Sequence, residues 1–151
     1  MKSLYTLSLM VSIGLFLGAC HPAKQISNVS SLKAPKAIGP YSQAIKVGGM
    51  VYCSGQIGLS PTTGALAGDD IATQTHQVME NLKAVLEEAG TDMKQVVKVT
   101  IYLKDLNDYA KVNDIYKDYF PDTKPARSTV QVARLPKDAL IEIDCIAVGN
   151  R

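Results

Sequence analysis

The dipeptide Gly48-Gly49 constrains the fold of this chain more than any other local feature. It separates two short runs of strand-forming residues, 44–47 and 50–57. Glycine accepts the positive φ angles that a tight hairpin turn requires. The sequence therefore predicts a β-hairpin formed by these two runs.

Two helices and three further strands are predicted after the hairpin. Apolar residues recur at helical spacing over 71–89, and Gly90 supplies a stop. Helical spacing returns over 106–120, ahead of Pro121. Three runs have the apolar and β-branched character of strands: 96–103, 127–135 and 140–148. The predicted order is ββαβαββ, an α+β layer with two helices on one face of a sheet.

Residue alternation along the last two strands predicts which side chains face the helices. The inward set comprises Val130, Val132, Ile141 and Ile143. The opposite face then carries Arg127, Thr129, Gln131, Glu142 and Asp144. A face with both apolar and hydrogen-bonding groups suits a subunit interface or a cleft. The alternative is a solvated sheet face, on which Arg127 and Glu142 form an ordinary ion pair.

The first 19 residues have the order of a secretory signal peptide. Lys2 precedes an apolar run over 4–17, which ends in small residues ahead of Cys20. The run is shorter than the roughly 20 apolar residues that a membrane-spanning helix needs. Leu17-Gly18-Ala19-Cys20 resembles the bacterial lipobox, in which the cysteine receives a diacylglyceryl group and the preceding peptide is removed. An ordinary signal with a coincidental cysteine is the alternative.

The predicted organisation is a signal peptide over 1–19, a lipidated cysteine and tether over 20–36, and one domain over 37–151. The tether is indicated by Ser, Asn, Ala, Lys and Pro without periodicity. A lipoprotein of this kind would lie on the periplasmic or cell-surface side of a bacterial membrane. His21, rather than Asp, follows the cysteine and favours the outer membrane.

Charge and cysteine content argue against several classes of protein. The formal net charge is +2, which does not indicate a nucleic-acid-binding surface. Besides Cys20, only Cys53 and Cys145 remain, too few for a disulfide scaffold. They form either one bridge or two buried thiols, and their apolar strand neighbours favour thiols. His21 and His76 lie far apart in the sequence without ligand clusters, so no metal site is expected.

Several sequence blocks resemble the RidA (YjgF) family of reactive-intermediate deaminases. The blocks IGPYSQA, SGQI, LKDLNDY, VN, PARS and LPKD occur in the family's order, within a match from about Ala34 to Val148. The resemblance implies a chorismate-mutase-like fold assembled as a homotrimer, with a central barrel and a cleft at each subunit boundary. It also implies hydrolysis of enamines and imines, such as 2-aminoacrylate, to 2-oxo acids and ammonia without a metal or organic cofactor.

The resemblance also assigns the site residues. Arg127 in PARS matches the arginine that binds the substrate carboxylate, and Glu142 in IEI matches the glutamate that positions water. A guanidinium can hold a carboxylate through two parallel hydrogen bonds, and a carboxyl group can move protons. The matching substrate-binding residues are Tyr41, Ser54, Gly55, Asn113 and Thr129.

Two positions depart from the family's usual residues. Thr129 stands where many bacterial members have Cys, and Asp144 stands where Glu is usual. The family's contact at the first position is largely through the backbone N–H, which Thr retains. Catalysis is therefore expected to survive with a changed pocket shape.

Two other functions stay open beside the deaminase. A membrane-anchored trimer could keep the cleft as a small-molecule binding or interaction module without catalysis, because a lipoprotein faces away from the cytosolic enzymes that family members usually protect. Ribonuclease or translation-inhibitor activity has also been ascribed to the family. The net charge of +2 and the lack of a basic patch interleaved with aromatic residues argue against it.

We expect the mature protein to begin at an acylated Cys20. Each buried acyl CH₂ contributes about 0.8 kcal/mol to membrane binding, so several chains would anchor the domain firmly. Mass spectrometry should show an acylated amino-terminal cysteine, and Cys20→Ser should move the protein to the soluble fraction. A Cys20→Ser protein that stays equally membrane-bound would refute lipidation.

Overall fold

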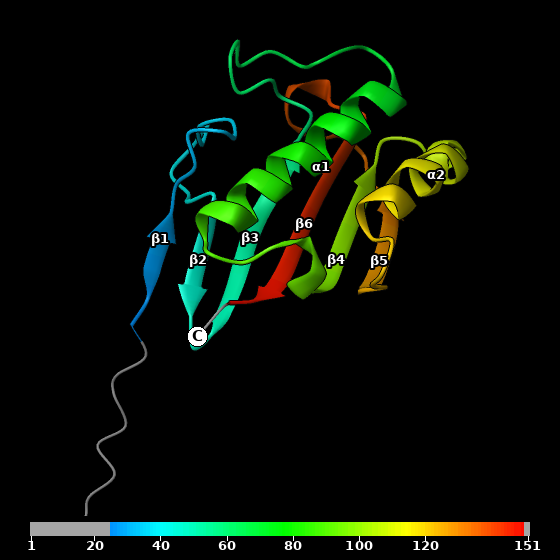
Figure 1. The fold of residues 1–151 in the computed structure, drawn as a ribbon. Coiled ribbons are helices and arrows are strands. Elements are labelled where there is room, and N and C mark those ends of the chain that lie inside the picture. Colours follow the sequence, from blue (N-terminus) through cyan, green and yellow to red (C-terminus); the bar gives the residue numbers. More distant parts are fainter. Residues whose placement is uncertain (1–24, 150–151) are drawn as a thin grey trace, which may run out of the picture.

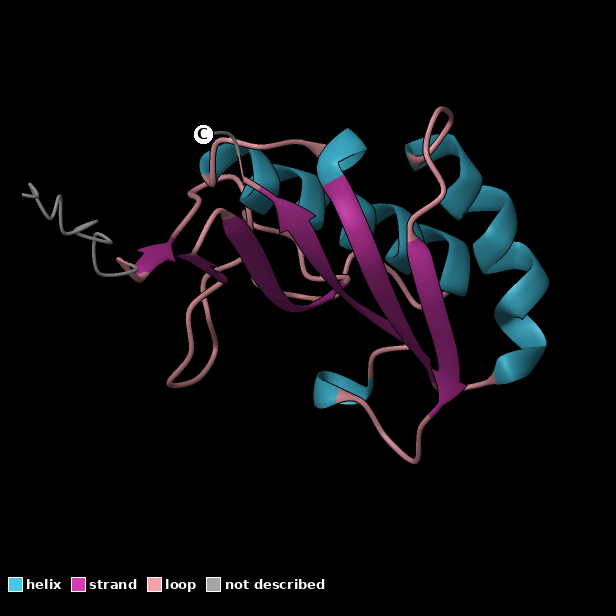
Figure 2. Ribbon diagram, turned by 90° about the horizontal axis from the view of Figure 1, so that it is seen from below, coloured by secondary structure: helices cyan, strands magenta, loops and turns pink. Residues whose placement is uncertain are grey.

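A mixed sheet with two helices over one face forms the fold (Figures 1 and 2). The computed structural model describes residues 25–149, so the signal-peptide and Cys20 predictions fall outside the described residues. The strands are β1 (Ser27–Val29), β2 (Ala44–Val47), β3 (Met50–Ile57), β4 (Val96–Leu103), β5 (Ala126–Gln131) and β6 (Ile141–Val148). The helices are α1 (Ile71–Glu88) and α2 (Tyr109–Tyr119), with 3-10 turns η1 (Met93–Gln95), η2 (Leu106–Asp108) and η3 (Pro136–Asp138).

The strand order in the sheet is β1-β2-β3-β6-β4-β5. The β4–β5 pair is parallel, and the other neighbouring pairs are antiparallel. The predicted α+β class, with both helices on one face, is confirmed. No helix within 25–149 is both long and apolar enough to cross a membrane.

The hairpin and the first helix form where the sequence predicts them. Gly48 and Gly49 adopt φ angles of 59° and 79° between β2 and β3, as a tight turn requires. Asp70 caps α1, and its carboxylate accepts hydrogen bonds from the backbone N–H groups of Ala72 and Thr73 at 2.9 and 3.0 Å. These contacts explain why the helix begins at residue 71.

The folded domain begins earlier than predicted. β1 lies within the stretch expected to be a tether and pairs with β2, with Ser27 opposite Lys46. Buried Gln43 holds the segment that follows, accepting a hydrogen bond from the Ser31 N–H and donating one to the Pro35 carbonyl at 2.7 Å. The tether prediction is therefore wrong for this part. The segment is ordered by backbone and amide hydrogen bonds, which leave no apolar periodicity in the sequence.

The apolar core lies between α1 and the middle of the sheet. α1 crosses β3 and β6 (Figure 1), and its buried side chains include Val78, Met79, Val85 and Leu86. The helix-free face keeps several large apolar side chains exposed: Tyr52 at 45%, Val130 at 43% and Val148 at 40%. The sheet thus has one covered and one open face.

The edge strand β5 has the opposite orientation from the prediction. Arg127 pairs in register with Val99, a core residue, so Arg127 faces α2 rather than the open face. Val130 pairs with Tyr102 and lies on the open face, where it is 43% exposed. The prediction assumed that the valine side chains of this strand face the helices. At this edge strand, however, aromatic residues of α2 cover the face that carries Arg127, and Val130 lies on the opposite face. Glu142 and Asp144 do lie on the open face, between the buried residues of β6.

We expect Asn81→Ala to lower the free energy of unfolding by about 1–3 kcal/mol, because two buried carbonyl groups would lose their donor. Asn81 is 1% exposed, and its amide donates to the carbonyls of Ile57 and Leu59 at 3.2 and 2.9 Å. Urea denaturation measures the change. Lys83→Ala, on the exposed side of the same helix, is the control and should stay within about 0.5 kcal/mol of wild type.

Candidate functional site

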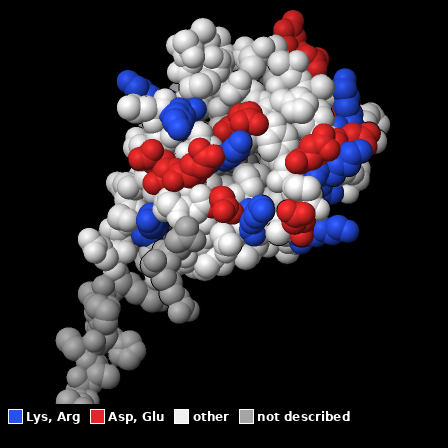
Figure 3. All heavy atoms as spheres, viewed as in Figure 1, with Lys and Arg blue, Asp and Glu red and all other residues white. Residues whose placement is uncertain are grey.

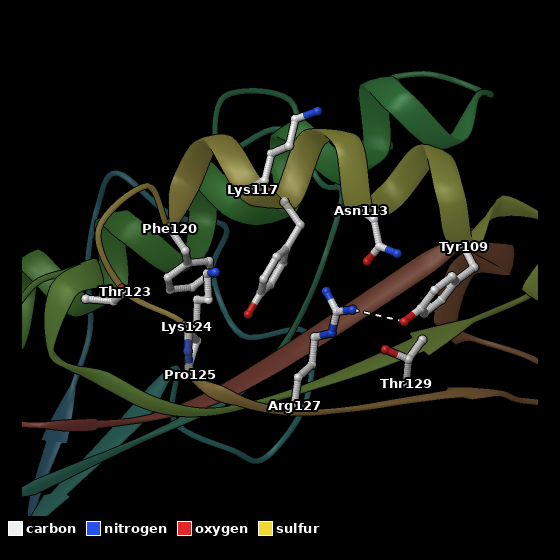
Figure 4. A pocket seen from close by; sticks show the side chains of 10 residues that line it. Tyr109, Asn113, Lys117, Phe120, Thr123, Lys124, Pro125, Arg127 and Thr129 are labelled. Carbon is white, nitrogen blue, oxygen red and sulfur yellow. Dashed lines mark hydrogen bonds between the residues drawn. The ribbon is translucent and has the colours of Figure 1, made fainter.

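A cavity of about 590 Å³ lies between α2 and β5 and contains Arg127 (Figure 4). We call it the Arg127 pocket. Helix α2 and its end contribute aromatic and amide side chains, the 123–125 segment closes one side, and β5 forms the floor. The lining residues are Tyr109, Asn113, Tyr116, Lys117, Phe120, Thr123, Lys124, Pro125, Arg127 and Thr129.

Aromatic side chains position the Arg127 guanidinium. It lies 4.7 Å from the centre of the Tyr116 ring and 5.7 Å from that of Tyr109, within cation–π range. One terminal N–H group donates to the Tyr109 hydroxyl at 3.1 Å. Figure 4 shows Arg127 rising from β5 toward α2, with this hydrogen bond dashed. No other hydrogen bond from this side chain to a residue in 25–149 is present, so the remaining N–H donors are available to a ligand.

The tyrosines of this pocket differ in acidity. Burial raises the pKa of Tyr116 to about 12, so its hydroxyl stays neutral at physiological pH. The pKa of the exposed Tyr109 hydroxyl is lowered by the Asn113 amide, which is the largest single cause, and also by the Arg127 guanidinium. Tyr116 Oη and Thr129 Oγ1 are buried and have no hydrogen-bond partner among the described residues. The pocket thus presents unpaired hydroxyl groups beside a guanidinium.

A second cavity, of about 270 Å³, contains Glu142. We call it the Glu142 pocket, and its lining residues are Ile38, Tyr41, Ser54, Gly55, Ile57, Pro136 and Glu142. Tyr41 is 46% exposed, and its hydroxyl accepts a hydrogen bond from the Ile38 N–H at 3.2 Å. The Ser54 hydroxyl donates to the Ser42 carbonyl at 2.7 Å. Strands β3 and β6 therefore carry this pocket, together with the segments before β2 and β6.

An irregularity in β3 makes room for the Glu142 carboxyl. The β3–β6 register shifts between Cys53 and Gln56, at the position of Gly55. A Cβ atom on Gly55 would lie 2.8 Å from Glu142 Cδ, closer than such atoms can approach. β-bulges often occur next to functional sites, where they reorient side chains. Glycine at this position therefore permits the observed placement of the carboxyl group.

Glu142 has the electrostatic setting of an acid–base group. Burial raises the pKa of Glu142, and the nearby Asp144 charge raises it further by a smaller amount. The Tyr102 hydroxyl donates to Asp144 Oδ2 at 2.9 Å, and Asp144 in turn raises the pKa of Tyr102. A carboxyl group with a raised pKa exchanges protons more readily near neutral pH. Asp144, for which the sequence suggested no role, thus influences Glu142.

The two pockets divide the predicted site residues between them. Arg127, Asn113 and Thr129 line the first pocket, and Glu142, Tyr41, Ser54 and Gly55 line the second, with no residue shared. Arg127 lies on the helix-covered side of the sheet and Glu142 on the open side. The alternative Arg127–Glu142 ion pair is absent from the ion pairs formed within 25–149. A single chain therefore presents two partial sites.

Tyr109, Tyr116 and Lys124 are pocket residues that the sequence reasoning missed. Both tyrosines belong to the apolar residues at helical spacing over 106–120, which is the usual pattern of core residues. The available signal was their spacing on the same helix, four residues before Asn113 for Tyr109 and three residues after it for Tyr116. Lys124 precedes the PARS block in a connecting segment without any recognisable pattern.

Cys53 and Cys145 are buried free thiols, which is the alternative that the sequence favoured. They lie directly opposite each other on β3 and β6. The Cys53 thiol, together with burial, raises the pKa of Cys145. Within 25–149, no three His, Cys, Asp or Glu side chains gather as metal ligands would.

Charges are mixed on the helix-covered face of the molecule. Figure 3 shows basic and acidic side chains interspersed over this face, with no extended area of one sign. Among the described residues, Lys94–Asp122, Lys117–Asp114 and Arg134–Asp138 form ion pairs. This face thus has no stripe of positive charge of the kind that follows a nucleic-acid backbone.

Comparisons with known proteins agree with the fold and the motifs. The family model described as Endoribonuclease L-PSP matches residues 31–149. A RutC family protein of Pyrococcus abyssi is 60% identical over 76% of this chain and 91% of its own length. The 2-iminobutanoate/2-iminopropanoate deaminase of Mus musculus is 48% identical over 80% of this chain and 89% of its own.

Solved structures give the same result. The structure of TdcF from E. coli with bound serine has a TM-score of 0.79 and 43% identity, over 82% of this chain and 99% of that chain. The YjgF gene product from E. coli has a TM-score of 0.78 and 46% identity over the same shares of the two chains, 82% and 99%. Together with the Arg127 and Glu142 pockets, these similarities show that the chain belongs to the RidA/YjgF family, the family described by the Endoribonuclease L-PSP model.

Proposed function

We propose that this protein hydrolyses reactive 2-imino acids and their enamine tautomers to 2-oxo acids and ammonia. The observation that carries the proposal is the Arg127 guanidinium, which is held by aromatic residues and has unused donors in a cavity of about 590 Å³. Relatives named as deaminases support the reaction class. The membrane-anchored binding module would use the same pocket without the chemistry.

Arg127 binds the carboxylate of the substrate in this mechanism. A 2-imino acid has one permanent negative charge, and a planar guanidinium can hold it through two parallel hydrogen bonds. The stacking of Arg127 over Tyr116 limits the motion of the guanidinium before the substrate arrives. This preorganisation reduces the entropy that binding costs and fixes the orientation of the imine carbon.

Glu142 moves protons in the hydrolysis step. A water oxygen bonds to the imine carbon while Glu142 accepts a proton from that water and passes it to the nitrogen, which gives a carbinolamine. Glu142 then moves the carbinolamine hydroxyl proton to the nitrogen as the C–N bond breaks, the C=O bond of the 2-oxo acid forms, and ammonia leaves. The raised pKa of Glu142 suits it to both accepting and returning a proton.

Arg127 and Glu142 act together only if a second copy of the chain completes the site. They lie in separate pockets on opposite faces of one sheet. The open face exposes Tyr52, Val130 and Val148, apolar groups suited to burial between subunits. A homotrimer in which each cleft combines the Arg127 pocket of one subunit with the Glu142 pocket of the next satisfies both observations. Attachment to the membrane through Cys20 remains part of this proposal.

Arg127→Ala should reduce imine hydrolysis to near the spontaneous rate, because the carboxylate loses its bidentate partner. Arg127→Lys keeps the charge but not the planar fork, so partial activity is expected. The assay is ammonia release from 2-imino acids generated in situ, with light scattering to establish that the variants remain trimeric. Arg134→Ala, an exposed arginine paired with Asp138 outside both pockets, is the control. Wild-type kcat/KM in Arg127→Ala would show that this side chain is only structural.

Glu142→Gln should lower kcat about 10²–10⁴-fold, because the amide cannot accept and return a proton. An unreactive 2-oxo acid should bind this variant about as well as wild type. Wild-type activity should fall as the pH drops through the pKa of Glu142, which lies above the ordinary glutamate value. The control is Glu88→Gln, at the exposed end of α1. If wild type binds the 2-oxo acid without accelerating hydrolysis, the binding module replaces the deaminase.

A further inference from the structure

The two cysteines of the folded domain lie directly opposite each other in the middle of the sheet. Cys53 is in β3 and Cys145 is in β6, and the two residues pair in register. Directly opposed side chains of antiparallel strands extend from the same face. Here it is the helix-covered face, because both residues belong to the apolar core. Residues 25–149 contain no other cysteine, so within them each thiol has only the other as a disulfide partner.

The spacing of opposed residues in an antiparallel pair suits a disulfide. Their Cα atoms lie about 4.5–5.5 Å apart, and disulfides join Cα atoms about 4.4–6.8 Å apart. The Cys53 thiol raises the pKa of Cys145 more than burial does, so the two thiols interact directly. The strands therefore need no large displacement for a bond to form between the two sulfur atoms.

The irregular part of β3 begins directly after Cys53. The β3–β6 register shifts between Cys53 and Gln56, where Gly55 makes room for the Glu142 carboxyl group. A β-bulge interrupts the ladder of hydrogen bonds between two strands, so the pairing is weaker here than along a continuous ladder. A covalent link at Cys53 would hold β3 against β6 at the edge of this irregularity.

We propose that Cys53 and Cys145 are oxidised to a cross-strand disulfide when the chain folds in contact with an oxidant, and that the structure shows the reduced state of this pair. The oxidant is a protein or small-molecule disulfide, the class of reagent that forms disulfides by exchange. The periplasm or cell surface predicted for this chain is a compartment where such bonds form and persist.

The reaction consists of two thiol–disulfide exchanges. Cys53, the more exposed thiol at 7% against 2% for Cys145, attacks the oxidant as a thiolate, forms a mixed disulfide and releases one thiol. The Cys145 thiolate then attacks Cys53 Sγ, forms the bond between β3 and β6, and releases the second thiol. The two cysteine protons pass to the two released thiolates. Two protein thiols are thus oxidised, and one disulfide is reduced.

Burial determines when the bond forms and how long it lasts. Both thiols are inaccessible once the strands have packed, so an oxidant reaches them readily only while the chain folds. The bond closes a loop of about 90 residues, and a link across a long loop restricts the unfolded chain strongly. The oxidised protein is therefore more stable than the reduced protein.

The test uses the full chain with Cys20→Ser, which leaves only the Cys53–Cys145 pair. Reduced protein is refolded from urea into a buffer of oxidised and reduced glutathione, with a parallel sample in dithiothreitol. Free thiols are blocked with N-ethylmaleimide in denaturant, and trypsin then cuts after Lys46, Lys83 and Lys137. Mass spectrometry without reduction should find peptide 47–83 linked to peptide 138–151. The oxidised protein should have a Tm about 5–15 °C above that of the reduced protein at the same concentration.

Cys53→Ala and Cys145→Ala control for other effects of the oxidant, and each should have the same Tm in both buffers. The linked peptide is measured without either variant, so the result does not depend on their folding. The same mapping of native protein held in urea below its unfolding midpoint needs no refolding step. Two thiols that stay free in both procedures, a lasting glutathione adduct on Cys53 alone, or a linked protein without a higher Tm would each overturn the inference. None of these outcomes depends on imine hydrolysis.

Discussion

Helices α1 and α2 cover one face of the sheet and leave the other face without a covering layer. A sheet face that exposes Tyr52, Val130 and Val148 retains apolar area that water solvates poorly. The same asymmetry separates the functional groups, because Arg127 points toward α2 and Glu142 toward the uncovered face. In the proposed homotrimer, a second copy of the chain both buries the open face and completes the site.

The two pockets affect the charged forms of Arg127 and Glu142 in different ways. Arg127 is held by the faces of two aromatic rings and one hydroxyl, which leave its charge available to an anion. Glu142 lies half-buried near Asp144, so its charged form is disfavoured and its proton is easily exchanged. These different surroundings suit the roles proposed for the two residues, Arg127 as a binding group that stays charged and Glu142 as a catalytic group that changes its protonation state.

Sequence periodicity predicted the central elements well and the edge strands poorly. β3, β4, β6 and α1 lie against the core, so their buried positions leave a clear pattern in the sequence. β1 is short and is held through backbone and Gln43 hydrogen bonds, and β5 is an edge strand with polar residues beneath α2. Because neither buries a continuous apolar face, the first was missed and the inward side of the second was misassigned.

The sequence by itself determined the order of the central elements and the hairpin at Gly48-Gly49, and through its motifs it singled out Arg127 and Glu142 as candidate site residues. These depend on local backbone preferences and on residue type, which the chain carries without folding. Only the tertiary structure decided that the two residues face different pockets, and that Tyr109, Tyr116 and Lys124 surround the first. Those relations arise from the parallel register of β5 and from the packing of α2 over it, which join residues that no local pattern connects.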